Sequence, residues 1–186
     1  IGKLVGDTYY GRDKAKAGDH IAVTGKLGQA AMGLRILQGR GQKQGMKSCT
    51  DRFLNPKPPY AVWKDLVKND ITDAMMDVSD GLLMDLTRMM AESKREARID
   101  LEKVPMPRYV RQNGLERLAL SGGEDYQLLF TFPEKKMPAV SALSEKGPGI
   151  TVIGRVFNGR GVRVFHNGKE MDMPDRTGFD HFGERP

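Results

Sequence analysis

Residues 71–93, with the sequence ITDAMMDVSDGLLMDLTRMMAES, contain the change of pattern that decides the fold. The first part, Ile71 to Met76, predicts a β-strand, and Asp80 to about Ser93 predicts the clearest helix of the chain. The apolar residues of that helix recur at helical spacing and form one stripe, made of Leu82, Leu83, Leu86, Met89 and Met90. A strand followed directly by an amphipathic helix indicates a domain that mixes both kinds of element.

Strand and helix patterns alternate on both sides of this unit. A connector that is neither helix nor central strand is expected at residues 55–59, because it contains three prolines. In the first helix we expect the apolar side to hold Ala30, Ala31, Leu34 and Leu37. The sequence therefore predicts an α/β (α+β) fold, a single mixed-sheet domain with helices packed on it. Strands are expected at residues 20–24, 97–101, 125–132, 151–157 and 161–165, and further helices at 28–37, 59–67 and 135–146.

Composition narrows the classes of function. The net charge is +6, with Lys and Arg spread along the chain rather than gathered in a run. This favours a solvated basic surface, with phosphorylated small molecules as the alternative explanation, and no nucleic acid is expected as a partner. No stretch approaches the roughly 18 consecutive apolar residues of a membrane span, so no membrane partner is expected. The single cysteine, Cys49, cannot form an intrachain disulfide, which favours a cytoplasmic location. The chain opens on Ile1 without an initiator Met, which suggests a fragment or a processed chain.

The first motif that suggests chemistry is Asp77-Val78-Ser79-Asp80-Gly81. It places two carboxylates three residues apart at the junction of strand and helix, where both could face one cleft. Mg²⁺ takes oxygen ligands, and one or two carboxylates plus substrate phosphates suffice to hold it. The start of the helix would add free backbone N–H groups for phosphate oxygens. The alternative is structural: Asp80 or Ser79 caps the helix and Asp77 is a loop residue.

The second motif is Ser121-Gly122-Gly123-Glu124-Asp125-Tyr126, which leads into an apolar strand. Its two glycines allow a tight turn or the close approach of a ligand. Acidic residues at the head of a buried strand need an explanation, because an unpaired buried charge is costly. Glu124 and Asp125 therefore either face a ligand at an open strand end or pair with Lys or Arg.

Together the two motifs resemble the C-terminal half of thiamine-monophosphate kinases, which belong to the superfamily of aminoimidazole ribonucleotide synthetase. Three further stretches are similar to the same family. They are the strand and glycine turn of residues 18–28, the proline-containing connector of residues 52–58, and Gly178-Phe179-Asp180-His181-Phe182 near the end of the chain.

The resemblance implies roles for six residues. In this family the two aspartates of the first motif ligate magnesium and its serine contacts ATP, which points to Asp77, Asp80 and Ser79. The glutamate of the second motif contacts thiamine phosphate, which points to Glu124. The aromatic residue of the C-terminal motif packs on the substrate, and an arginine before the first strand contacts the nucleotide. These last two roles fall on Phe179 and Arg12, for which packing on the core and simple surface exposure are the alternatives.

The resemblance also implies an activity and an organisation. Residues 1–17 would be the remnant of an interdomain connector, and residues 18–186 the C-terminal domain that binds substrate and ATP. The reaction would be Mg²⁺-dependent and direct, from ATP to thiamine phosphate, with no residue as a covalent nucleophile. The N-terminal half is absent, and the parent enzyme is expected to form a homodimer through it, so the isolated chain is expected to be inactive or nearly so. The alternatives are another ATP-dependent enzyme of the superfamily, a non-catalytic thiamine-phosphate-binding module, or, on charge alone, a nucleic-acid binder.

Overall fold

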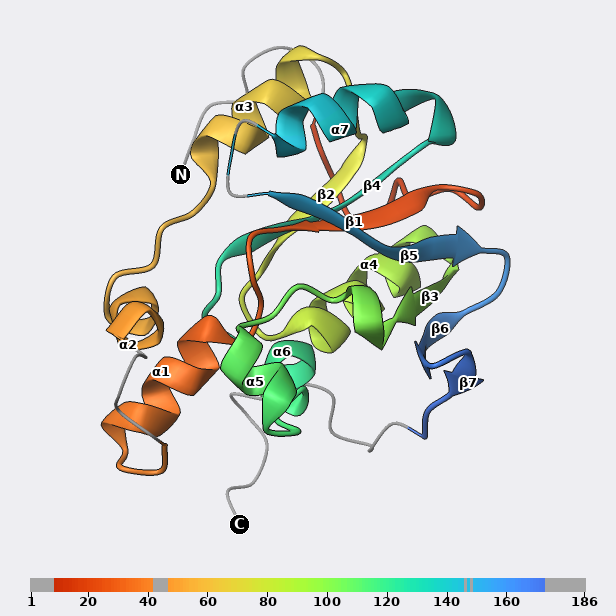
Figure 1. Ribbon diagram of the computed structural model, residues 1–186. Helices are drawn as coiled ribbons and strands as arrows, with labels where there is room; N and C mark the ends of the chain where they lie inside the picture. The colour runs from red at the N-terminus through yellow and green to blue at the C-terminus, as the bar shows by residue number, and fades with distance from the viewer. Residues whose placement is uncertain (1–8, 42–46, 146, 148, 173–186) are drawn as a thin grey trace.

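The computed structural model describes residues 9–41, 47–145, 147 and 149–172. A mixed seven-stranded sheet, formed within these residues, lies between two layers of helices (Figure 1). The strand order is β2-β4-β1-β5-β3-β6-β7, and all neighbours are antiparallel except β3 and β6. The strands are β1 (His20–Thr24), β2 (Ala74–Val78), β3 (Glu96–Asp100), β4 (Gln127–Phe132), β5 (Ile150–Phe157), β6 (Gly161–His166) and β7 (Lys169–Glu170).

The helices cover both faces of the sheet. Figure 1 shows α3 and α7 on one face, and α4, α5 and α6 on the other, with α1 and α2 at the edge of that second layer. The helices are α1 (Gln29–Leu37), α2 (Lys47–Leu54), α3 (Tyr60–Lys68), α4 (Leu82–Ser93), α5 (Arg108–Gln112), α6 (Arg117–Ser121) and α7 (Met137–Ser144), with 3₁₀ turns at Leu101–Lys103 and Glu134–Lys136. Among the described residues, no helix is long and apolar enough to cross a membrane.

The alternation of side chains along β1 divides the core in two. Ile21 and Val23 face the layer of α4, and Ala22 faces the layer of α3 and α7. Because both faces of the strand are covered, all five of its residues are buried. The predicted apolar stripe of α4 is confirmed, since all five of its residues are at most 1% exposed.

The predicted fold class is confirmed, but some boundaries were wrong for a local reason. β2 begins at Ala74 rather than Ile71, and α4 begins at Leu82 rather than Asp80. β4 begins at Gln127 rather than Asp125, because Glu124 and Tyr126 both have positive φ angles, which strands do not accommodate. The shifts of α4 and β4 concern the two loops that carry the acidic motifs, whereas the shift of β2 lies at the opposite end of that strand. The other predicted strands and helices start and end within a few residues of the observed elements.

The predicted apolar side of α1 was wrong. Its buried residues are Ala30, Met32, Gly33 and Ile36, whereas Leu34 and Leu37 are 37% and 51% exposed. Gly33 makes this orientation possible, because a Cβ there would lie 2.2 Å from the carbonyl oxygen of Cys49 in α2. Contact with α2, which the sequence analysis did not predict, therefore sets the rotation of α1.

The residues before β1 pack against the domain. Ala15 is buried and donates its backbone N–H to Ser93 Oγ at 3.1 Å, and Gly11 forms an isolated bridge with Ala74. The proline-containing run at 55–59 joins α2 to α3, as predicted for a connector. The domain boundary at residues 17 and 18 stays a prediction.

Candidate functional site

The turn between β2 and α4 is held by a buried carboxylate. The Asp85 side chain is 0% exposed, and its Oδ2 accepts the backbone N–H groups of Ser79 and Asp80 at 3.0 Å each. Burial raises the pKa of Asp85, and these two backbone hydrogen bonds oppose the rise. The two amides before the helix are therefore not free for a phosphate. The expectation that N–H groups of the helix start bind phosphate stays a prediction for α4, which begins at Leu82.

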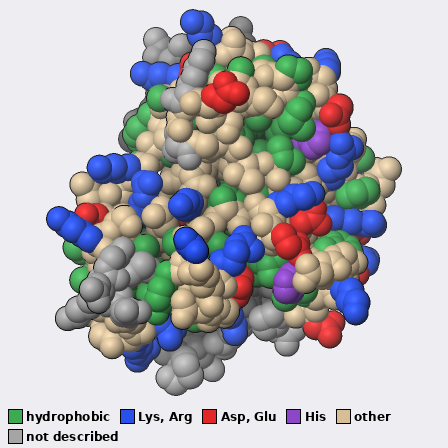
Figure 2. All heavy atoms as spheres, in the orientation of Figure 1, with side chains coloured by type: hydrophobic (Ala, Val, Ile, Leu, Met, Phe, Trp, Pro, Cys, Tyr) green, Lys and Arg blue, Asp and Glu red, His purple; other side chains and the backbone are tan. Residues whose placement is uncertain are grey.

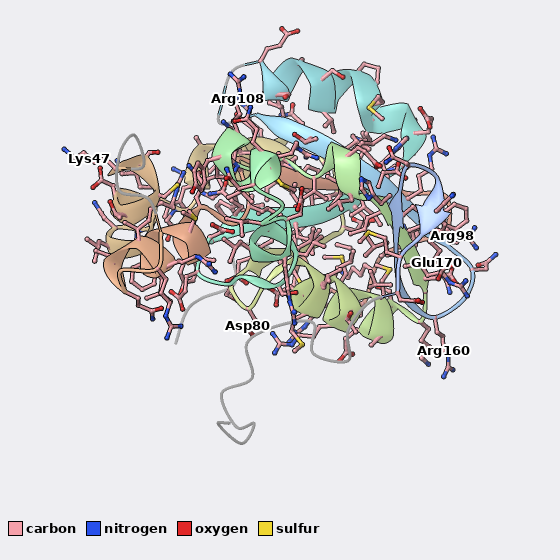
Figure 3. All side chains as sticks on the ribbon, turned by 60° about the horizontal axis from the view of Figure 1, so that its bottom comes forward. Lys47, Asp80, Arg98, Arg108, Arg160 and Glu170 are labelled. Atoms are coloured by element: carbon pink, nitrogen blue, oxygen red, sulfur yellow. The ribbon has the colours of Figure 1, made fainter. Side chains whose placement is uncertain are left out.

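The Asp80 carboxylate is bonded to Arg88, which lies in α4 together with Asp85. Arg88 Nη1 donates to Asp85 Oδ1 at 3.0 Å and also bonds Asp80 Oδ2. Figure 3 shows Asp80 beside the start of α4. The Asp80 side chain is 20% exposed, so its carboxylate is oriented by Arg88 yet still reaches solvent.

The second motif lies against this turn. Glu124 donates its backbone N–H to the Ser79 carbonyl at 2.8 Å, and Tyr126 donates to the Val78 carbonyl at 2.9 Å. A Cβ at Gly123 would lie 2.4 Å from the Ser79 carbonyl oxygen, so only glycine lets the two backbones approach this closely. Segments far apart in the sequence thus form one continuous wall.

Asp125 and Glu124 point in opposite directions. Asp125 is 1% exposed and accepts the backbone N–H groups of Gly28 and Ala30, where α1 begins. Burial raises its pKa from 3.8 to about 6, against the effect of those hydrogen bonds. Asp125 is therefore a cap for α1, supplied from another part of the chain because Gly28 has no side chain. Glu124 is exposed.

Ser79, Asp80 and Glu124 line one hollow of about 630 Å³ between α1 and the two loops. Apolar and basic groups complete its wall. They are Ala31, Leu34, Phe53 and Leu118, with Arg35, Gln38 and Arg40. The hollow therefore offers carboxylates, cations and apolar surface together.

Asp77 lines a different hollow, which corrects the prediction that both aspartates face one cleft. Its neighbours there are Pro58, Pro59, Tyr60, Trp63, Tyr126 and Leu128, around about 360 Å³. Tyr126 lines the same hollow as Asp77. Burial raises the pKa of Tyr126, and a hydrogen bond to Glu124 and the charges of Asp77 and Asp80 raise it further. The carboxylates of Asp77, Asp80 and Glu124 thus all raise the pKa of the Tyr126 hydroxyl. Among the described residues, no three His, Cys, Asp or Glu side chains lie close enough together to hold a metal ion.

The structure does not bring Arg12 to this site. Arg12 is exposed, and its carbonyl accepts the Ser93 hydroxyl at 2.8 Å, at the far end of α4 from Ser79. A 12-residue helix is about 18 Å long, which sets the scale of the separation. Phe179 lies outside the described residues.

Several residues of the site were not predicted from the sequence. Leu34 was placed on the buried side of its helix, although it is out of phase with Met32 and Ile36, and this mismatch is a signal of an exposed apolar residue. Asp85 had a signal too, because it interrupts an apolar stripe between Leu83 and Leu86. Arg35, Arg40 and Phe53 carried no signal in the pattern.

Comparisons with known proteins agree on one group. The model of the family described as "AIR synthase related protein, C-terminal domain" matches residues 16–167. Thiamine-monophosphate kinase of Escherichia coli K12 is 38% identical over 180 residues, which cover 92% of this chain and 54% of that protein. The corresponding enzyme of Methanopyrus kandleri is 35% identical over 174 residues, covering 90% and 52%.

Solved structures give the same result. Thiamine-monophosphate kinase of Stenotrophomonas maltophilia K279a matches with a TM-score of 0.75 and 33% identity, covering 87% of this chain and 54% of that one. AaThiL complexed with AMPPCP and TMP matches with a TM-score of 0.74 and 33% identity, covering 94% and 55%. The chain spans about half the length of the curated relatives that it matches.

Proposed function

The chain belongs to the AIR synthase related protein C-terminal domain family, and from this premise we propose that it is the C-terminal half of a thiamine-phosphate kinase. The parent enzyme would transfer the γ-phosphoryl group of ATP to thiamine phosphate and release ADP and thiamine diphosphate. The observation that supports this most directly is the single hollow lined by Ser79, Asp80 and Glu124. AaThiL, which shares the fold, binds AMPPCP and TMP.

The hollow suits a ligand that has a cationic ring and an anionic phosphate. The exposed carboxylate of Glu124 complements the positive thiazolium ring of thiamine phosphate. Arg35 and Arg40 supply cations for its phosphate, and Leu34 and Phe53 supply apolar surface for its flat rings. A neutral or uniformly anionic ligand would leave one of these sets unpaired.

We propose Asp77 and Asp80 as Mg²⁺ ligands. They fit a hard cation because both are carboxylates with access to solvent. Since the two line separate hollows, phosphate oxygens and water would complete the coordination at each. When bound, Mg²⁺ would neutralise phosphate charge and align the transfer. Ser79 is the residue that we expect to hold an ATP phosphate oxygen through its hydroxyl.

The chemistry to be overcome is repulsion between two phosphates, because donor and acceptor are both anionic. The accepting oxygen of thiamine phosphate is already an anion, so no strong base is required. We therefore assign the residues of this chain to binding and orientation, with direct transfer and no phosphorylated enzyme intermediate. We also propose that an N-terminal half supplies the remaining groups and the homodimer contact, and that the enzyme works in the cytoplasm.

Calorimetry with the full-length protein tests the assignment. We expect thiamine phosphate to bind at least about 10-fold more tightly than thiamine or an unrelated sugar phosphate, which corresponds to about 1.4 kcal/mol. Glu124→Ala should remove most of the selectivity over the sugar phosphate, which lacks the cationic ring that Glu124 complements. Glu92→Ala, which changes an exposed glutamate of α4 outside the hollow, should leave it unchanged. Phe179→Ala tests the remaining predicted substrate contact.

The alternatives give different results. Equal binding of thiamine phosphate and the sugar phosphate would favour another enzyme of the superfamily. Selective binding without ADP formation by the full-length protein would favour a non-catalytic binding module. Binding to DNA or RNA with a steep dependence on salt would favour a nucleic-acid binder. Figure 2 shows Lys and Arg side chains in several separate groups on one face, which does not resemble a continuous basic track.

The isolated 186-residue chain has a prediction of its own. We expect it to show little or no turnover of ATP with thiamine phosphate. Robust turnover by the purified chain would contradict the assignment of further catalytic groups to another part of the protein.

A further inference from the structure

Asp85 is placed in a way that ordinary helix capping does not explain. It lies in the first turn of α4 and is 0% exposed, within an otherwise apolar stripe. A buried carboxylate is costly unless hydrogen bonds satisfy it. Its bonds run back to the N–H groups of Ser79 and Asp80, which precede the helix, rather than to amides of the helix itself.

The other side of the same turn is held by the second motif. The Ser79 carbonyl accepts the N–H of Glu124 at 2.8 Å, while its own N–H is bonded to Asp85 at 3.0 Å. The peptide groups of Ser79 are thus fixed from the helix on one side and from the Glu124 loop on the other. This arrangement sets the direction of the Ser79 and Asp80 side chains, both of which line the hollow.

Arg88 links Asp85 to the side chain of Asp80. One of its nitrogens, Nη1, is bonded both to Asp85 Oδ1 and to Asp80 Oδ2. Asp85 therefore anchors the cation that orients the carboxylate of Asp80. A single buried group determines the position of the turn and the direction of one of its acids.

We propose that Asp85 is a positioning residue for the transfer reaction. It holds Ser79 and Asp80 in the geometry that they need before any ligand arrives, and it does not touch the substrate. The reaction that it serves rests on the proposed function, but the fixed turn does not. Positioning of this kind matters because misplacing a reacting group by about 1 Å can cost about 100-fold in rate.

The experiment compares two substitutions at Asp85 with a matched control in the full-length protein. Asp85→Ala removes both carboxylate oxygens, and Asp85→Asn keeps one oxygen for the two amides but loses the charge that holds Arg88. Glu96→Ala removes another buried acid, 5% exposed and paired with Arg98 and Arg163, from β3. It controls for a general loss of stability.

Two measurements are made on each variant. Hydrogen exchange by NMR reports the backbone amides of Ser79 and Asp80, and steady-state kinetics with thiamine phosphate reports kcat and KM. Asp85→Ala should speed exchange of these two amides at least about 10-fold and lower kcat about 10- to 100-fold, the range for residues that orient a metal ligand. KM should change by less than about 3-fold. Asp85→Asn should recover most of the amide protection but only part of kcat, because it no longer holds Arg88, and Glu96→Ala should change neither.

Three outcomes would overturn the proposal. The first is rapid exchange of the Ser79 and Asp80 amides in the unmodified protein. This outcome can be measured even if no variant folds. The second is normal kcat in Asp85→Ala after the two amides have lost protection. The third is an equal loss of kcat in Asp85→Ala and Glu96→Ala. If the unmodified protein does not turn over thiamine phosphate, the proposed function fails, whereas amide exchange still decides whether Asp85 fixes the turn.

Discussion

Two loops meet at the hollow, and beside each of them an acid that reaches solvent is accompanied by a buried acid. After β2, Asp80 in the loop reaches solvent and Asp85 in the first turn of α4 is buried. In the loop before β4, Glu124 is exposed and Asp125 is buried. Both buried acids accept two backbone N–H groups. At each loop, therefore, a buried carboxylate fixes backbone close to an acid that lines the hollow.

The loops differ in how the buried charge is compensated. Asp85 is bonded to the guanidinium of Arg88, whereas within the described residues Asp125 forms no ion pair. Burial raises the pKa of both acids, and that of Asp125 rises to about 6. The first loop is held by charge pairing and the second mainly by amide hydrogen bonds, so changes of pH and sequence should affect them differently.

The largest expected effect concerns pH and Asp125. Its pKa is about 6 in the folded state, above the ordinary value of 3.8. The folded state therefore binds this proton more tightly than the unfolded state does. The resulting contribution to stability is present below pH 3.8 and is lost as the pH rises through about 6. The free energy of unfolding of the unmodified protein, minus that of Asp125→Asn, should fall by about 2 to 3 kcal/mol from pH 4 to pH 7. Urea denaturation at several pH values measures it. A difference that rises with pH would mean that the amide hydrogen bonds outweigh burial.

The next effect tests the contact between the loops. Gly123→Ala would place a Cβ 2.4 Å from the Ser79 carbonyl oxygen, and backbone cannot move aside as a flexible side chain can. We expect a loss of about 2 kcal/mol in the free energy of unfolding, the scale of overpacking. Gly147→Ala is the control, because its nearest contact is a Val62 methyl group at 3.3 Å. Equal stability of the two variants would show that the loops separate at little cost.

The smallest expected effect comes from removing the cation that is bonded to Asp85. Arg88→Gln leaves Asp85 buried on its two amides without a bonded cation. Because Arg88 is 40% exposed and solvent screens the pair, we expect a loss of only about 1 kcal/mol in the free energy of unfolding. Lys16→Gln, which breaks the exposed pair with Asp73, should cost less than about 0.3 kcal/mol. A loss as small for Arg88→Gln would mean that the amides alone hold Asp85.

Much of the fold follows from patterns within short segments. The strand-to-helix change at residues 71–93 predicts β2 and α4, because periods of about 2 and 3.6 residues depend only on neighbouring positions. The helices α2, α5 and α6 were not predicted. For α5 and α6 the reason is their length, because five residues are too few to establish a period of 3.6 residues. The rotation of α1 was predicted incorrectly, because a contact between Gly33 and α2 sets it.

In the site, too, some features were predicted from the sequence and others depend on tertiary contacts. The sequence by itself determined which residue types stand at the two loops, and hence the predicted roles of Ser79, Asp80 and Glu124, which share one hollow. Only the tertiary structure decided that Asp125 turns inward while Glu124 turns outward, and that Asp77 lines a separate hollow. The direction of a side chain in a loop is set by the groups it contacts. For Asp125 those groups are amides of α1, almost a hundred residues earlier in the chain.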